Sequence, residues 1–115
     1  MSRVLVIDDD PMILRMAGFI LKKGGHTAQT ASSGKEGLDA VRGDCPDCVF
    51  IDNEMPEMTG IEVLEAIRSD SSLSELRVCI MTGTLTDELK EKAGAFGAGC
   101  IGKPLVAPEM LSILG

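Results

Sequence analysis

The stretch VLVIDDDP, residues 4–11, joins four aliphatic residues to three acids and a proline. A short run rich in β-branched residues that stops at turn-forming residues is typical of a strand. Asp10 is a good helix cap, and Pro11 suits the first turn of the helix that would follow it. Apolar residues then recur at helical spacing until Gly24 and Gly25. The stretch therefore predicts a strand, a turn and a helix in succession.

The same alternation continues to the end of the chain. Strands are expected at residues 26–31, 48–52, 78–82 and 100–102, and helices after Ser33, over residues 60–68, from Thr86 and from Pro108. Strict alternation of strands and helices is typical of a parallel sheet joined by crossover helices. We therefore expect an α/β fold, a doubly wound (βα)5 three-layer sandwich around a five-stranded parallel sheet. For the strand order we expect the flavodoxin-like 2-1-3-4-5, which is common among doubly wound folds.

The first expected helix has an apolar pattern that includes two methionines. Met12 and Met16 stand at helical spacing, which puts them on one face of the helix. Methionine at such positions commonly fills gaps in a core. We therefore expect Met12 and Met16 to belong to the hydrophobic core rather than to a site.

Length and charge limit the classes of protein to which the chain can belong. With 115 residues, of which 44% are hydrophobic and 25% charged, it is long enough for one domain with a layered core. Its 11 basic and 18 acidic residues give a formal charge of −7. This balance argues against general nucleic-acid binding, which needs clustered basic charge, and against an anionic membrane surface as a partner.

The ends of the chain and its cysteines bear on where the protein works. No basic segment and apolar helix precede the first strand, as a signal peptide would require, and no apolar stretch approaches the ~20 residues that span a bilayer. We therefore expect a cytoplasmic location with the four cysteines reduced. Residues 1–115 are expected to form a single domain, and trimming from a longer parent protein would explain the short helical stretch before Gly115.

Four of the expected strands end on residues that can bind a phosphoryl group or a metal ion. The first is followed by Asp8 and Asp9, and the others end on or run into Asp52, Thr82 and Lys103. Ligands of open α/β sheets bind outside the carboxyl ends of the strands. Each residue alone could be ordinary turn chemistry. Their joint placement at four strand ends predicts that they converge in one site.

The residue types at these strand ends favour phosphoryl transfer. Carboxylate oxygens suit Mg²⁺, which typically binds through one or two carboxylates and keeps several waters. A carboxylate beside Mg²⁺ can attack phosphorus to give an aspartyl phosphate, and this chemistry depends mostly on positioning and charge neutralisation. Lys103 supplies a positive charge for a phosphate, and Thr82 supplies a hydroxyl donor.

Together these segments resemble the CheY-like receiver domain of two-component response regulators. Residues 6–10 resemble the acidic pocket of that family, and residues 51–60 (IDNEMPEMTG) resemble its phosphoacceptor segment. Residues 81–83 resemble its hydroxyl residue followed by a small residue, and residues 102–104 its lysine and proline. The order and spacing of all four segments fit, and the resemblance covers essentially the whole chain.

The resemblance implies a role for each residue of the site. Asp52 would be the phosphoacceptor, Asp9 a direct Mg²⁺ ligand and Asp8 a ligand through water, while Glu54 would offer its backbone carbonyl to the metal. Thr82 and Lys103 would hold the phosphoryl oxygens. The side chains of Glu54 and Thr84 stand where the family tunes the lifetime of the phosphate.

The resemblance also implies partners. The phosphoryl donor would be a phosphohistidine on a histidine kinase or a histidine phosphotransfer protein, with small acyl phosphates as substitutes. Such a domain catalyses only its own phosphorylation and dephosphorylation, and switches a surface read by a downstream effector or output domain. The identity of that effector is left open by the sequence, and a homodimer is a further option.

One position departs from the family pattern. Receivers usually carry Tyr or Phe three residues before the lysine, and here that residue is Cys100. The loop at residues 97–99 also looks one residue short. We expect the chemistry at Asp52 to survive both changes, and the conformational response around Cys100 to be weaker.

Two other families share part of the pattern. Residues 8–10 also fit the Asp-x-Asp nucleophile motif of haloacid-dehalogenase phosphatases. Those enzymes need a second acidic pair late in the chain and usually a cap domain, whereas this sequence has no late Asp-Asp pair and is short. A flavodoxin-like flavin carrier would share the fold, yet three Phe and no Trp or Tyr leave little to stack on the flavin. Turnover of a phosphomonoester, or colour in the purified protein, would separate these alternatives.

Cys45 and Cys48 match the Cys-x-x-Cys spacing of redox and zinc sites. No second Cys or His pair in the sequence supplies further zinc ligands, and no expected helix N-terminus follows to lower a thiol pKa. Because Cys48 opens an apolar run, we expect it to act as a small buried hydrophobic residue.

Overall fold

Five parallel strands form a single sheet in the order β2-β1-β3-β4-β5, which confirms the predicted topology. This computed structural model describes residues 1–114. The strands are β1 (Arg3–Ile7), β2 (Thr27–Ala31), β3 (Cys48–Asp52), β4 (Arg77–Thr82) and β5 (Gly99–Gly102). Each lies within a residue or two of the bounds expected from the sequence.

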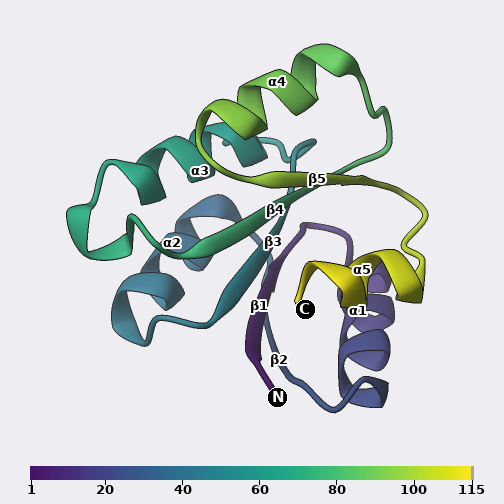
Figure 1. Cartoon of the computed structure of the whole chain (residues 1–115). Helices are drawn as coiled ribbons and strands as arrows, with labels where there is room; N and C mark the ends of the chain where they lie inside the picture. Colours follow the sequence, from purple (N-terminus) through teal and green to yellow (C-terminus); the bar gives the residue numbers. More distant parts are fainter. Residues whose placement is uncertain (115) are drawn as a thin grey trace.

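Helices cover both faces of the sheet, so the predicted (βα)5 three-layer sandwich is confirmed. They are α1 (Pro11–Lys23), α2 (Gly34–Gly43), α3 (Gly60–Arg68), α4 (Asp87–Ala95) and α5 (Ala107–Ile113), with a short 3₁₀ helix η1 (Ser71–Leu73) before β4. Helices α1 and α5 lie on one face, and α2, α3 and α4 lie on the other (Figure 1). None of the helices among the described residues is long and apolar enough to cross a membrane.

The core consists of two apolar layers, one on each side of the sheet. Within β1, Leu5 and Ile7 face the layer under α2, α3 and α4, while Val4 and Val6 face the layer under α1 and α5. Every residue of the central strand β3 is buried. Burial of both faces is what a parallel sheet between two helix layers requires, and it holds the strand ends rigidly in register.

The expectation that Met12 and Met16 belong to the core is wrong. Their exposed fractions are 68% and 43%, and Phe19 on the same side of α1 is 64% exposed. The helix instead buries a neighbouring stripe that includes Ala17, Ile20 and Leu21. Both stripes have helical spacing, so spacing alone does not decide which one faces the sheet.

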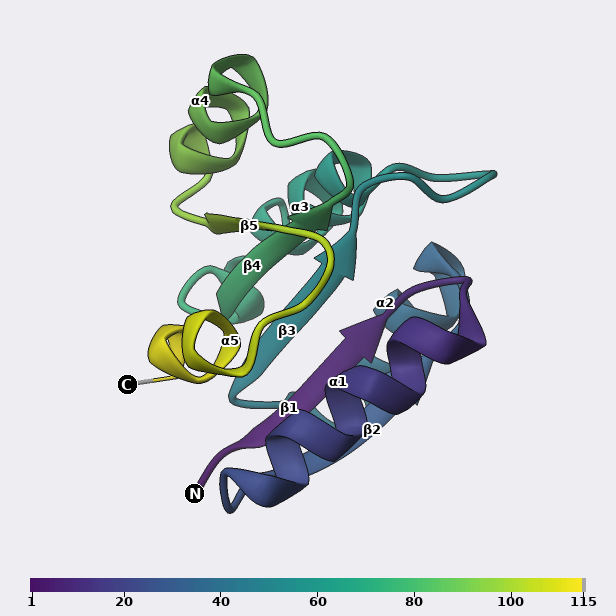
Figure 2. The ribbon, with the colours of Figure 1, turned by 90° about the vertical axis from the view of Figure 1, so that its right-hand side faces the viewer.

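Side-chain caps fix the turns that follow the strands. The Asp10 carboxylate accepts a hydrogen bond of 2.9 Å from the backbone N–H of Met12 and begins α1 as predicted. Thr59 and Glu62 form a reciprocal capping box at the start of α3. The loop between β3 and α3 projects from the carboxyl edge of the sheet, as Figure 2 shows.

Gly60 lets α3 begin against the end of β3. A Cβ atom at this residue would lie 2.8 Å from the carbonyl oxygen of Asp52 and 3.0 Å from the Cα of Asn53. Both are backbone atoms, so they cannot move aside as a flexible side chain can. The close approach therefore requires glycine and sets the position of the loop after Asp52.

We expect Gly60→Ala to lower the free energy of unfolding by about 1–3 kcal/mol, because the added methyl forces a backbone shift in a packed region. Gly18→Ala is the matched control, since nothing lies within 4 Å of a Cβ at that position in the middle of α1. It should raise the free energy of unfolding by about 0.5–1 kcal/mol through helix propensity. Urea unfolding measures both; equal stability of the two variants would contradict the role assigned to Gly60.

Candidate functional site

The carboxyl ends of β1 and β3 bring three carboxylates together. Asp8, Asp9 and Asp52 each offer one oxygen, and these oxygens lie within 4.8 Å of one another. Among residues 1–114, this is the only group of three or more acidic, His or Cys side chains placed to share a metal ion. Asp8 and Asp52 are buried, and Asp9 is exposed. Crowding of like charges is unfavourable unless a cation neutralises them.

Lys103 supplies a positive charge between two of these acids. It follows β5, and its ammonium nitrogen Nζ lies 2.9 Å from Asp52 Oδ1 and 2.9 Å from Asp8 Oδ2. Burial lowers the pKa of Lys103, but the hydrogen bonds and negative charges of Asp52 and Asp8 outweigh burial and raise that pKa above its usual value. Lys103 is therefore a cation that joins the ends of β1, β3 and β5.

The positive charge of Lys103 does not fully offset the unfavourable environment of the Asp8 carboxylate. Burial raises the pKa of Asp8 above its usual value, and the negative charge of Asp52 adds to the rise. Asp8 Oδ1 accepts a hydrogen bond of 2.9 Å from the backbone N–H of Asp10. Its Oδ2 is buried and, although close to Lys103, accepts no well-directed hydrogen bond. Lys103 therefore shares its single positive charge between Asp8 and Asp52, so a further cation would relieve the remaining repulsion.

The set of side chains fits Mg²⁺. All three acids offer hard oxygen ligands, as this ion prefers, and one oxygen of each lies within 4.8 Å of the others. Three carboxylates against one lysine also leave the cluster with net negative charge, which a divalent cation would neutralise. The acidic cluster is thus suited to hold this metal.

Thr82 lies at the end of β4, where its hydroxyl is tied to Glu54. The hydroxyl donates to Glu54 Oε2 over 2.7 Å, and the backbone N–H of Gly83 donates to Glu54 Oε1 over 2.8 Å. The Glu54 carboxylate therefore points to the end of β4 and is not part of the acidic cluster. Sequence reasoning missed this pair of contacts, because it assigned Glu54 only a backbone carbonyl and a general tuning position.

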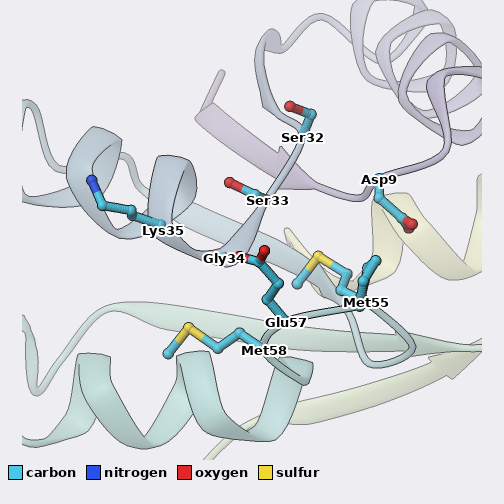
Figure 3. Close-up of a pocket in the computed structure, with 9 residues that line it drawn as sticks. Asp9, Ser32, Ser33, Gly34, Lys35, Met55, Glu57 and Met58 are labelled. Carbon is cyan, nitrogen blue, oxygen red and sulfur yellow. The ribbon is translucent and has the colours of Figure 1, made fainter.

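The acidic cluster borders a pocket of about 400 Å³. Figure 3 shows Asp9 pointing from the loop after β1 toward Met55, with Met58 on the same β3–α3 loop. The opposite wall comes from the loop after β2 and the start of α2, including Ser33 and Lys35. The exposed side of the cluster is therefore open to an incoming group.

The two cysteines of the Cys-x-x-Cys segment lie in different environments. Cys45 is exposed, whereas Cys48 is buried in the apolar layer under α1 and α5. Burial raises the pKa of the Cys48 thiol to about 11, which leaves little reactive thiolate at neutral pH. The prediction that Cys48 is a small buried hydrophobic residue is confirmed.

The strain on Asp8 gives a pH-dependent test. The pKa of Asp8 in the folded state is raised above 3.8, so the folded state binds this proton more tightly than the unfolded state does. The stability that comes from protonation is therefore lost as pH rises through the folded-state pKa. Without metal ion at neutral pH, we expect Asp8→Asn to raise the free energy of unfolding, because the amide brings no buried charge. Below the unfolded-state pKa, the variant and the parent should converge.

Urea unfolding at pH 7 and pH 3, with chelator and then with Mg²⁺, measures this effect. Asp9→Asn is the matched control, because Asp9 is exposed and should change metal-free stability little. Mg²⁺ should stabilise the parent more than the Asp8→Asn variant. A less stable Asp8→Asn protein at pH 7 without metal would contradict the electrostatic account.

Known proteins resemble this chain in sequence and in overall fold. The family model of the response regulator receiver domain matches residues 4–114. Response regulator MprA of Mycolicibacterium vanbaalenii is 31% identical over 113 residues, covering 96% of this chain and 47% of that protein. DNA-binding response regulator MtrA of Mycolicibacterium smegmatis is 34% identical over 94 residues, covering 82% and 41%. The chain thus spans about half the length of these curated relatives.

Solved structures agree with the sequence comparison. The chemotaxis response regulator CheY4 of Vibrio cholerae is 31% identical with a TM-score of 0.90, covering 99% of this chain and 96% of that one. The N-terminal domain of a response regulator receiver protein from Methanoculleus marisnigri is 33% identical with a TM-score of 0.85, covering 99% and 94%. The chain therefore belongs to the family of response regulator receiver domains.

Proposed function

We propose that residues 1–115 form a single receiver domain that accepts a phosphoryl group on Asp52 from a phosphohistidine. The observation that carries this proposal is the Lys103 ammonium group, which lies 2.9 Å from Asp52 Oδ1 and 2.9 Å from Asp8 Oδ2. Receiver domains of response regulators act in phosphorelay signalling, so the domain would be a signalling module that catalyses only its own phosphorylation and dephosphorylation.

Asp52 is better suited than its neighbours to act as the nucleophile. Lys103 Nζ and the backbone N–H of Glu54 both donate to Oδ1 of Asp52, at 2.9 and 3.3 Å. These bonds orient the carboxylate and leave Oδ2 to attack phosphorus. Asp8 is fully buried, and Asp9 is exposed and forms no ion pair with a lysine among residues 1–114. In the transfer, the new O–P bond forms at Asp52 as the P–N bond of the donor breaks and its electron pair returns to the imidazole.

The other residues would stabilise charge on the transferred group. Asp8, Asp9 and Asp52, with the backbone carbonyl of Glu54, would hold Mg²⁺, which when bound neutralises negative charge on the phosphoryl oxygens. The Lys103 ammonium would pair with one phosphoryl oxygen. The Thr82 hydroxyl and the backbone N–H of Gly83 would donate to another.

The partners follow from the same chemistry. The donor would be a histidine kinase or a histidine phosphotransfer protein, and a downstream effector or output domain would read the phosphorylated state. MtrA is named as a DNA-binding response regulator, but this domain carries a formal charge of −7, which disfavours direct contact with nucleic acid. We therefore assign nucleic-acid binding to no part of this domain.

Asp52→Asn should abolish phosphoryl incorporation from acetyl phosphate, because an amide cannot act as the nucleophile. The incorporated group should be acid-stable and base-labile, and labelling should vanish with chelator and return with Mg²⁺ or Mn²⁺. Asp9→Ala should weaken metal binding more than Asp8→Ala. Full labelling of Asp52→Asn, or equal labelling with and without metal, would rule out the proposed chemistry.

The structural response should be concentrated in the loop after Thr82. Cys100 is half-buried beside the apolar layer under α2, α3 and α4, and its side chain is much smaller than a tyrosine or phenylalanine ring. Filling space vacated by Thr82 would therefore bury little area. A phosphoryl group shifts a conformational equilibrium only through its different interactions with the two states, and here Thr82 and Lys103 would provide that difference without a ring.

We therefore expect beryllofluoride, a mimic of the phosphoryl group, to change the amide chemical shifts around Thr82 much more than those at residues 98–110. Two-dimensional NMR of the protein with Mg²⁺, before and after addition of beryllofluoride, measures both regions together. Shifts of the same size in both regions would show that the coupling does not need an aromatic residue at position 100.

A further inference from the structure

The carboxylate of Glu54 holds the two groups at the end of β4 that a phosphoryl group would need. Oε2 accepts from the Thr82 hydroxyl over 2.7 Å, and Oε1 accepts from the Gly83 backbone N–H over 2.8 Å. These distances are those of hydrogen bonds strengthened by a charged acceptor. Each carboxylate oxygen is therefore used on a different donor.

The Thr82 hydroxyl has no second proton to offer. A hydroxyl donates one hydrogen bond, and the alternative acceptor, the carbonyl oxygen of Thr84, is farther away at 3.2 Å. The hydroxyl oxygen in turn accepts from the backbone N–H of Thr84 over 3.1 Å. Thr82 is buried, so its hydroxyl can serve a new acceptor only by leaving Glu54.

We propose that Glu54 is a positioning residue that competes with the phosphoryl group for the Thr82 hydroxyl and the Gly83 amide. This inference rests on the proposed phosphorylation of Asp52. Carboxylate and phosphoryl oxygens are both anionic acceptors and satisfy the same donors. Phosphorylation would therefore have to displace the Glu54 side chain from the end of β4, and the displacement would set part of the cost of activation.

The backbone around Glu54 allows its side chain to move alone. The backbone N–H of Glu54 is bonded to Asp52 Oδ1, and the side chain of Asn53 accepts from the N–H of Ile61 over 3.2 Å. These contacts fix the loop while the Glu54 side chain remains exposed. It can therefore swing away without moving the backbone carbonyl proposed as a metal ligand.

The structure also offers a place for the displaced carboxylate. Glu54 and Thr82 line a polar pocket of about 310 Å³ in front of α4, and Lys92 lines the same pocket. Lys92 lies 3.4 Å from Glu88 in an exposed ion pair, which is weak enough to exchange partners. The displaced Glu54 carboxylate could thus pair with the Lys92 ammonium group, which lines the same pocket.

The inference predicts a gain of function, which damage to the fold would not produce. At saturating Mg²⁺, Glu54→Ala should bind beryllofluoride roughly tenfold more tightly than the parent, since two charge-assisted bonds no longer have to be broken. Glu54→Gln should lie between the two, because its neutral amide competes less well. The Gly83 amide resonance should shift in the metal-free Glu54→Ala protein, which reports directly on the lost bond.

Glu57→Ala controls for the simple removal of negative charge. Glu57 is exposed on the same loop, and among the described residues it forms no hydrogen bond with Thr82 or Gly83. We expect the affinity of the Glu57→Ala variant for beryllofluoride to stay within about twofold of that of the parent protein. Mg²⁺ affinity, measured without beryllofluoride, should change by the same small factor in Glu54→Ala and Glu57→Ala.

A double-mutant cycle with Thr82→Ala locates the competition. Where the hydroxyl is already absent, Glu54→Ala should raise beryllofluoride affinity clearly less than it does in the parent. Equal gains in the two backgrounds, or a gain no larger than that of Glu57→Ala, would overturn the role of Glu54 and leave Asp52 as the acceptor. A parent protein that neither binds beryllofluoride nor takes up phosphoryl groups would instead overturn the proposed function.

Discussion

The contact of Lys103 with Asp8 and Asp52 is the interaction on which the site depends. One ammonium nitrogen lies 2.9 Å from an oxygen of each acid, so it neutralises part of the repulsion between two buried carboxylates. Burial and the charge of Asp52 still raise the pKa of Asp8. The protein thus keeps an unfavourable concentration of negative charge at the edge of its sheet, held in place by packed strands rather than by the charges themselves. This surplus of negative charge suits a site that binds a divalent cation.

The packing of the sheet offsets the unfavourable charge of the acidic residues. All residues of β3 are buried, and the apolar layers on both faces contribute far more to stability than one unfavourable charge removes. Gly60 adds a second constraint, since its missing side chain lets α3 approach the backbone of Asp52. The acidic residues therefore occupy positions that the fold imposes. The hydrogen bond between the Thr82 hydroxyl and the Glu54 carboxylate then links the loop after β3 to the end of β4.

Much of this arrangement could be predicted from sequence because the strands of a parallel sheet share an edge. The apolar runs predicted β1, β3, β4 and β5, and the residues at or just after their ends predicted a site with Asp8, Asp52, Thr82 and Lys103. Spacing failed for α1, where two neighbouring stripes are both apolar and the exposed one contains Met12 and Met16. It also failed for the Glu54 carboxylate, whose direction depends on a side-chain rotamer that no periodic pattern encodes. The three-residue helix η1 was too short to leave a recognisable signal.

The site is also assembled from parts of the chain that are synthesised at different times. Asp52 and Lys103 are separated by 51 positions in sequence, and Asp8 follows the first strand while Lys103 follows the last. Contacts between distant segments form late in folding, because closing long loops costs chain entropy before the contacts form. In a nascent or partly unfolded chain, Lys103 therefore does not yet contact Asp8 and Asp52. Such a chain would lack the geometry for the proposed phosphoryl transfer. Competence for the proposed phosphoryl transfer would then be a property of the completed fold, and incomplete molecules would lack it.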